Sequence, residues 1–271
     1  MDQKPIVIIG GGITALSIAV QLSLAHIPFI ILEKSPRIGG QIETRQVNGY
    51  TFETGPNTGS FSTPEVAELF DFAQCPAEIA QEAAKARWIW KKDRFYPLPS
   101  SVRSAITTPL FRFSDKLRIL AEPWRKRGSD PHESIGALAE RRLGKSFVDY
   151  AVDPFIGGIY AGDPYVLCTR YALPKLHHLE QEHGSFIRGS IAKMRRPLTE
   201  REKRATKKIF SAPGGLETLV ISLVNRLKEE GASGSEFVTQ ADITSIEYID
   251  TFQWKITAHI HGNPPLGKEY V

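Results

Sequence analysis

The chain has 271 residues, of which 41% are hydrophobic and 24% charged. This composition excludes a disordered polypeptide and allows one large or two modest globular domains. The formal net charge of +4 permits contact with acidic ligands or anionic lipid, but no nucleic-acid-binding motif accompanies it, so nucleic acid is not an expected partner. No apolar run reaches about 18 residues, no signal-peptide pattern occurs, and Cys75 and Cys168 are isolated, which together favour a cytoplasmic protein without a spanning helix.

The chain opens with a strand, a turn and a helix. Residues 6–9 are β-branched throughout, as expected for a central parallel strand buried on both faces, and they run directly into three glycines. Apolar residues then recur at helical spacing, to pack on the sheet: Ile13, Leu16, Val20 and Leu24. This order predicts an α/β fold of the Rossmann type, a parallel sheet with helices.

The glycines and the helix that follows them form a candidate dinucleotide site. Gly10, Gly12 and Ala15 stand at the three fingerprint positions, which serve a tight turn, close approach to a pyrophosphate and helix–strand contact. A helix N-terminus also offers free N–H groups to phosphate. The predicted cradle is Gly10, Gly11, Gly12, Ile13, Thr14 and Ala15.

An acidic residue follows the second predicted strand. Residues 29–32 are apolar and end at Glu33, where a carboxylate can accept hydrogen bonds from the hydroxyls of an adenosine ribose. A carboxylate at this position disfavours a 2′-phosphate, and therefore NADP.

The next residues distinguish FAD from NAD. Lys34-Ser35-Pro36-Arg37-Ile38-Gly39-Gly40-Gln41 resembles the amine oxidase, phytoene desaturase and protoporphyrinogen oxidase superfamily, whose acidic strand end is followed by Arg-x-Gly-Gly. Adjacent glycines let the main chain pass close to a cofactor, and an arginine can form charge-assisted hydrogen bonds with a phosphate. An ordinary loop with a glycine pair is the alternative. The resemblance implies FAD, bound with the help of Lys34, Arg37, Gly39, Gly40 and Gln41.

Three further segments resemble parts of the same superfamily. Two strands at 42–47 and 50–53, joined by Asn48-Gly49, predict a type I′ hairpin, and a helix is expected to begin with Thr63 and Pro64. The loop that follows the hairpin resembles the loop beside the flavin, which adds Gly55, Pro56 and Asn57 to the predicted site. Ile243 lies in a segment that resembles the strand at the adenine end of FAD, although a short β-branched segment is as often only a strand.

The segment 152–164 narrows the resemblance. Val-Asp-Pro-Phe-Ile-Gly-Gly-Ile-Tyr-Ala-Gly-Asp-Pro is similar to the Gly-Val-Tyr-Ala-Gly-Asp-Pro segment of oxygen-dependent, FAD-containing protoporphyrinogen oxidases. The resemblance implies oxidation of protoporphyrinogen IX in heme biosynthesis, with O2 as the acceptor. Oxidation of coproporphyrinogen III, or of another substrate by an amine oxidase or desaturase, stays open. Gly158 and Ile159 would then line the substrate pocket, and the flavin would carry the chemistry without a catalytic side chain.

The substrate carboxylate has two candidate partners on a predicted hairpin at 88–97. Plant relatives are expected to carry an arginine where Tyr96 falls, and Arg94 lies two residues earlier on the same face as a substitute. A lone arginine beside a turn is, however, usually exposed to solvent. A cluster of histidines and glutamates at 177–183 invites a metal interpretation, but no second cluster fixes a geometry, so no metal is expected.

We expect a discontinuous FAD domain at 1–87 and 206–250, a helical insert at 98–205, and parts of a substrate sheet at 88–97 and 251–271. Apolar and basic residues mix in 98–127, which fits amphipathic helices on an anionic bilayer as well as solvated helices. The resemblance implies peripheral attachment to the inner face of a membrane, and a homodimer stays open. Since relatives continue beyond the equivalent of Val271, we expect a truncated family member. The alternative to an active enzyme is an inactive fragment that retains only the cradle for ADP.

Overall fold

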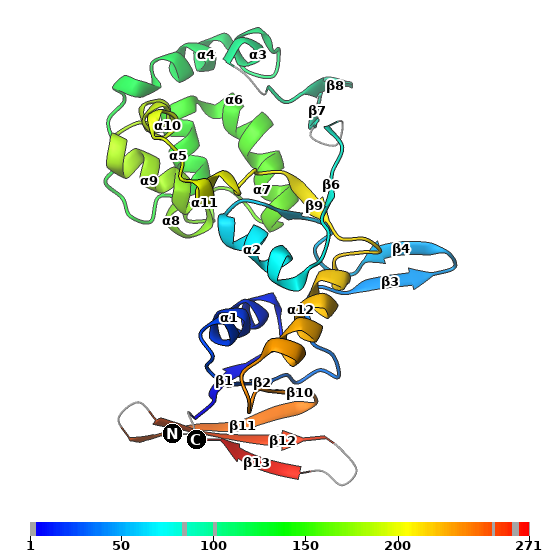
Figure 1. Ribbon diagram of the computed structural model, residues 1–271. Helices are drawn as coiled ribbons and strands as arrows, with labels where there is room; N and C mark the ends of the chain where they lie inside the picture. Colours follow the sequence, from blue (N-terminus) through cyan, green and yellow to red (C-terminus); the bar gives the residue numbers. More distant parts are fainter. Residues whose placement is uncertain (1–3, 83–85, 100–101, 251–252, 262–265, 271) are drawn as a thin grey trace. The chain divides into compact units, whose positions relative to one another are not determined.

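The computed structural model describes residues 4–82, 86–99, 102–250, 253–261 and 266–270. The chain forms two compact units, the first made of Met1–Ala80 and Leu198–Val271 and the second of Gln81–Pro197 (Figure 1). The predicted segment 88–97 is fully described, whereas 251–271 includes residues outside the described ranges, and the domain assignment stays a prediction.

A parallel sheet lies in the middle of the first unit. It contains β1 (Ile6–Ile9), β2 (Phe29–Leu32) and β10 (Glu236–Val238), in the order β1-β2-β10. The central strand is β2, and all four of its residues are buried. The prediction that residues 6–9 form a central strand was wrong: among the described strands only β2 pairs with β1, and Ile6 and Ile9 stay 45% and 49% exposed at the open edge.

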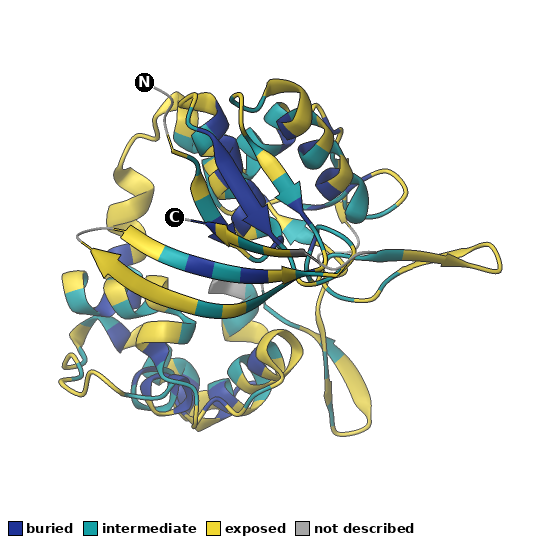
Figure 2. Ribbon diagram, turned by 90° about the horizontal axis from the view of Figure 1, so that it is seen from below, coloured by how far each residue is buried: buried dark blue, intermediate teal, exposed yellow. Residues whose placement is uncertain are grey.

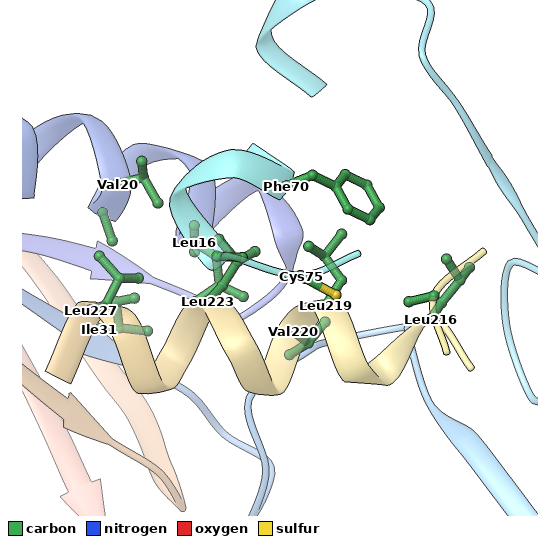
Figure 3. Packing of buried hydrophobic residues seen from close by; sticks show 14 of the residues in the cluster. Leu16, Val20, Ile31, Phe70, Cys75, Leu216, Leu219, Val220, Leu223 and Leu227 are labelled. Atoms are coloured by element: carbon green, nitrogen blue, oxygen red, sulfur yellow. The ribbon is translucent and has the colours of Figure 1, made fainter. Parts of the chain in front are cut away.

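Helices cover one face of this sheet. They are α1 (Ile13–Leu24) and α12 (Glu217–Glu230), and α2 (Pro64–Ala73) packs on these two helices. Figure 3 shows Leu16 and Val20 of α1 facing the apolar stripe of α12, which contributes Leu219, Val220, Leu223 and Leu227. The predicted stripe of α1 is confirmed except at its end, since Leu24 is 62% exposed.

An antiparallel sheet covers the other face. It contains β11 (Ala241–Asp250), β12 (Gln253–Ile260) and β13 (Leu266–Tyr270), with Ile256 paired with Ile246 and Tyr270. Ala241, Ile256 and Ala258 pack with Ile30 and Leu32 of β2. The dark-blue strand β2 at the centre of the parallel sheet in Figure 2 is therefore buried between two layers, which confirms the α/β fold class.

Smaller elements complete the first unit. The hairpin of β3 (Thr44–Val47) and β4 (Tyr50–Glu53) turns at Asn48 and Gly49, whose φ values of 53° and 81° fit the predicted type I′ turn. Strands β5 (Gly59–Ser60), β9 (Ile209–Ser211) and β6 (Glu78–Ile79) form a small sheet in the order β5-β9-β6. Thr63 and Pro64 begin α2 as predicted, and α11 (Glu200–Lys203) is the remaining short helix.

The second unit is a hairpin followed by helices. The hairpin pairs β7 (Trp88–Lys91) with β8 (Arg94–Pro97). The helices are α3 (Val102–Thr107), α4 (Phe113–Leu120), α5 (Ile135–Leu143), α6 (Lys145–Phe147), α7 (Asp153–Tyr160), α8 (Thr169–Ala172), α9 (Pro174–His183) and α10 (Phe186–Arg195). A 3-10 turn at Glu122–Trp124 and a π-helical turn at Val148–Val152 join them. Within the described residues, no helix combines the length and apolarity that crossing a membrane requires.

Buried charges hold the helices of the second unit together. Arg142 on α5 is fully buried and pairs with Glu122, which is also fully buried, and with Glu180, which is 2% exposed. The carboxylate of Glu122 also accepts the N–H groups of Phe186 and Ile187, at 2.9 and 3.2 Å, at the start of α10. One arginine thus joins three elements that are distant in sequence.

Candidate functional site

The N-terminus of α1 carries the predicted phosphate cradle. Gly10 has a φ of +91° and donates its N–H to Leu32 O at 2.7 Å, which turns the chain out of β1. Gly12 precedes the first turn in an extended conformation, and no side chain caps the helix there. The first turn has no acidic residue, so its N–H groups, which lack intrahelical acceptors, face no competing carboxylate on their own helix.

The space around two of the glycines tests whether a phosphate fits. A Cβ added at Gly11 would lie 2.7 Å from Ile38 Cδ1 and 3.1 Å from Glu33, so a larger residue would require these side chains to shift. A Cβ at Gly12 would meet nothing within 4 Å, and the φ of −76° suits any residue. The fold has no internal need for Gly12, and the open space before the helix fits a phosphate of a dinucleotide.

Glu33 lies at the end of β2, where the sequence predicts a ribose partner. Its Oε2 accepts the N–H of Gly11 at 2.5 Å, and its Oε1 accepts the N–H of Ser35 at 2.7 Å together with the Ser35 hydroxyl. Partial burial raises the pKa of Glu33, but the hydrogen bonds from Ser35 and Gly11 and the charge of Arg37 outweigh it, so the pKa lies below its usual value. The side chain is therefore an ionised acceptor at neutral pH.

The start of β11 lies beside Glu33. The N–H of Ala241 donates to Glu33 O at 2.9 Å, and Lys34 forms an ion pair of 3.2 Å with Asp242. Ile243 is half-buried two residues further along β11. The structure therefore brings this predicted residue to the same edge as Glu33, while the Lys34 side chain is 80% exposed.

The glycine pair lies against the cradle. Gly39 donates its N–H to Gly11 O at 2.8 Å, and a Cβ at Gly40 would lie 3.1 Å from Gly12 Cα. Arg37 donates from its two terminal nitrogens to Gly40 O at 2.8 Å and to Ile42 O at 2.9 Å. In this structure the arginine braces the loop through main-chain carbonyls, and its contact with a phosphate stays a prediction.

The third predicted segment joins the same place. A Cβ at Gly55 would lie 1.9 Å from Gln41 O, so only glycine allows this close approach. Pro56 and Asn57 follow at the surface. The cradle, the glycine pair and the segment after β4 are thus contiguous, although they come from three parts of the sequence.

The second unit contains a cavity of about 400 Å³. Its lining is mainly apolar and includes both residues predicted from the 152–164 segment: Arg87, Trp88, Ile89, Leu98, Ala151, Pro154, Phe155, Gly158 and Ile159. The predicted anchors Arg94 and Tyr96 are not among these residues. The cation of the cavity is Arg87, whose guanidinium lies 5.4 Å from the centre of the Phe155 ring. Sequence reasoning missed Arg87 because it considered only the second strand of the hairpin.

Two consecutive glycines lie within α7. A Cβ at Gly157 or Gly158 would meet nothing within 4 Å, so no packing contact requires either glycine. A glycine inside a helix costs about 0.5–1 kcal/mol relative to alanine. Gly158 lines the cavity, so the absence of a side chain there leaves this part of the cavity open.

Comparison with known proteins identifies the family of the chain. Residues 14–262 match the family described as flavin containing amine oxidoreductase. The chain belongs to this family. Among solved structures, it is similar in fold to a reduced UDP-galactopyranose mutase, with a TM-score of 0.60 and 20% identity over 100% of this chain and 54% of that one. It is also similar to the CLA-producing fatty acid isomerase of P. acnes, with a TM-score of 0.62 and 17% identity over 98% of this chain and 57% of that one.

Several curated relatives are porphyrinogen oxidases. The mitochondrial protoporphyrinogen oxidase of Nicotiana tabacum is 28% identical over 93% of this chain and 53% of its own length. The protoporphyrinogen oxidase of Homo sapiens is 31% identical over 85% of this chain and 52% of its own length. The coproporphyrinogen III oxidase of Bacillus subtilis is 29% identical over 83% of this chain and 52% of its own length. The chain therefore spans about half the length of these relatives.

Proposed function

We propose that the chain binds FAD and takes part in the oxidation of protoporphyrinogen IX to protoporphyrin IX, with O2 as the acceptor, in heme biosynthesis. The observation that carries this proposal is a pair of glycines without a packing role, Gly12 before α1 and Gly158 in the cavity. One suits a phosphate, and the other leaves room for a flat macrocycle. The relatives named protoporphyrinogen oxidase, from tobacco and human, support the substrate.

The residues of the chain would bind and orient the two partners. The N–H groups of the first turn of α1 would receive the pyrophosphate, and the ionised Glu33 would accept the ribose hydroxyls in place of its present N–H donors. Bound flavin would supply the redox chemistry, taking electrons in pairs from the porphyrinogen and passing them to O2.

In the second unit, Arg87 would bind a carboxylate of the porphyrinogen, because it is the cation among the described residues that line the cavity. Trp88, Phe155 and Ile159 would cover the apolar ring and exclude water. Arg94 is the alternative anchor and lies exposed on β8.

The purified protein should be tested for FAD and then for substrate. Bound flavin is read from its visible absorbance, and its anaerobic bleaching is measured with protoporphyrinogen IX, coproporphyrinogen III and an amine. Bleaching by protoporphyrinogen alone supports the proposal, while bleaching by the amine alone identifies an amine oxidase instead. FAD binding without any bleaching identifies a fragment that holds only the cofactor.

Coproporphyrinogen III is the second candidate substrate. The B. subtilis relative named for it matches at 29% identity, close to the 28% of the tobacco relative. The two porphyrinogens differ in their number of carboxylates, so the dependence of KM on Arg87 should differ between them. Faster bleaching by coproporphyrinogen III than by protoporphyrinogen IX would favour this candidate.

We also propose that the second unit lies on the inner face of a membrane. On α4, Phe113 and Leu117 are 75% and 51% exposed and alternate with basic residues, and Trp124 nearby is 78% exposed. Apolar side chains among cations suit the interface of an anionic bilayer. Flotation with phosphatidylglycerol vesicles, but not with phosphatidylcholine vesicles, is the expected result, and replacing Phe113 and Trp124 with serine should abolish it.

A further inference from the structure

Two segments distant in sequence exchange hydrogen bonds behind the glycine loop, defined here as Gly39, Gly40 and Gln41. The N–H of Thr44 on β3 donates to Glu217 Oε2 at 3.1 Å, and the N–H of Glu217 donates to Thr44 Oγ1 at 3.1 Å. The exchange is reciprocal, like that of a capping box, but its partners lie 173 residues apart. Gly215 permits the approach, since a Cβ there would lie 2.2 Å from Thr44 Cγ2.

Glu53 on β4 extends this contact. Its Oε2 accepts the hydroxyl of Thr44 at 2.9 Å, and its Oε1 accepts the N–H of Leu216 at 2.8 Å. The hairpin of β3 and β4 thus provides acceptors for two consecutive N–H groups at the start of α12, those of Leu216 and Glu217. The N-terminus of α12 is fixed against the hairpin.

The carboxylate of Glu217 also lies near Arg37, which holds the glycine loop through main-chain carbonyls. Its Oε1 lies 3.7 Å from Nη1 of Arg37, the residue that donates to Gly40 O and Ile42 O. The two side chains are 24% and 34% exposed, so solvent screens their attraction and its main effect is on geometry. Val220, one turn further along α12, would lie 3.2 Å from a Cβ at Gly39.

We propose that Glu217 is a positioning residue for the flavin: it orients Arg37, and Arg37 sets the distance of the glycine loop from the cradle on α1. This inference rests on the proposed binding of FAD. A loop held before the cofactor arrives loses less conformational freedom on binding. Glu217 would therefore raise the affinity for FAD and fix the environment of the bound flavin without contacting it.

The test compares Glu217→Gln, Thr44→Val and the control Glu229→Gln. The control removes the same charge from the exposed last turn of α12, where Glu229 pairs with Arg226. The dissociation constant for FAD is measured by flavin fluorescence quenching, and the visible circular dichroism of the bound flavin is recorded at saturation. Thermal midpoints without FAD report folding.

Glu217→Gln and Thr44→Val are each expected to raise the dissociation constant about five- to tenfold and to alter the flavin circular dichroism, while Glu229→Gln changes neither. A role in stability alone would lower the thermal midpoint and leave the spectrum of the saturated protein unaltered. If Glu217→Gln leaves both the dissociation constant and the spectrum unaltered, the inference about Glu217 is overturned, while the proposed binding of FAD is unaffected. If the unaltered protein binds no FAD, the proposed function fails as well.

Discussion

Arg142 provides the sharpest test of how the second unit is held together. In the Arg142→Met variant, a side chain of similar length replaces a fully buried guanidinium. The change removes the pairing with Glu122, the bond of 2.7 Å from Nε to Glu180 Oε1 and the bond of 2.7 Å from Nη2 to Gly184 O. Two buried carboxylates then lose their shared cation.

The expected cost is about 3–5 kcal/mol of unfolding free energy, because removing one member of a buried ion pair leaves uncompensated charge. Some compensation remains: Glu122 still accepts two N–H groups of α10, and Glu180 still pairs with Arg141 at 2.9 Å. These contacts place the expected cost near the lower end of that range.

Arg141→Met is the matched control. Arg141 directly precedes Arg142 on α5 and pairs with Glu133 and Glu180, but its side chain is 31% exposed, so solvent screens its pairs. Its loss should cost about 1 kcal/mol. Urea unfolding is followed by tryptophan fluorescence, because Trp88, Trp90 and Trp124 lie in the second unit and Trp254 in the first. Equal costs for the two variants would refute the idea that burial makes Arg142 the critical partner.

Three further predictions follow from single residues. Gly12→Ala should leave the thermal midpoint unchanged, since its Cβ meets nothing within 4 Å, yet weaken FAD binding at least about tenfold, as measured by fluorescence quenching. Gly158→Ala should stabilise the second unit by about 0.5–1 kcal/mol in urea unfolding and still lower kcat/KM for the porphyrinogen; an increase in both would contradict a substrate role. Burial raises the pKa of Glu180, but hydrogen bonds from Gly128, Arg142 and Arg141 outweigh this effect and hold the pKa in the folded protein below its usual value of 4.5. The ionised Glu180 therefore stabilises the fold above pH 4.5, and this stabilisation is lost as the pH falls through the pKa of the folded protein. Urea midpoints between pH 7 and pH 3 should therefore fall more steeply for the unaltered protein than for Glu180→Gln.

The sequence determines the local parts of the site. The three glycines, the helix behind them and the acidic end of β2 follow each other within one strand–helix–strand unit, so spacing alone indicates their relation. The turn at Asn48 and Gly49 is equally local, because its two positive φ values depend on those residues themselves. The family resemblance of 152–164 likewise singles out Gly158 and Ile159, and both residues line the cavity of the second unit.

Tertiary structure decides the contacts that sequence separation hides. The apolar sequence of residues 6–9 predicts a central strand, yet β1 lies at the edge of the sheet, because its position depends on which other strands pair with it. Arg87 enters the cavity because α7 packs near the hairpin, and no local pattern distinguishes it from Arg94. The reciprocal bonds of Thr44 with Glu217 and the buried pair of Arg142 with Glu122 join residues that only folding brings together, since a hydrogen bond depends on distance in space and carries no periodic signal in the sequence.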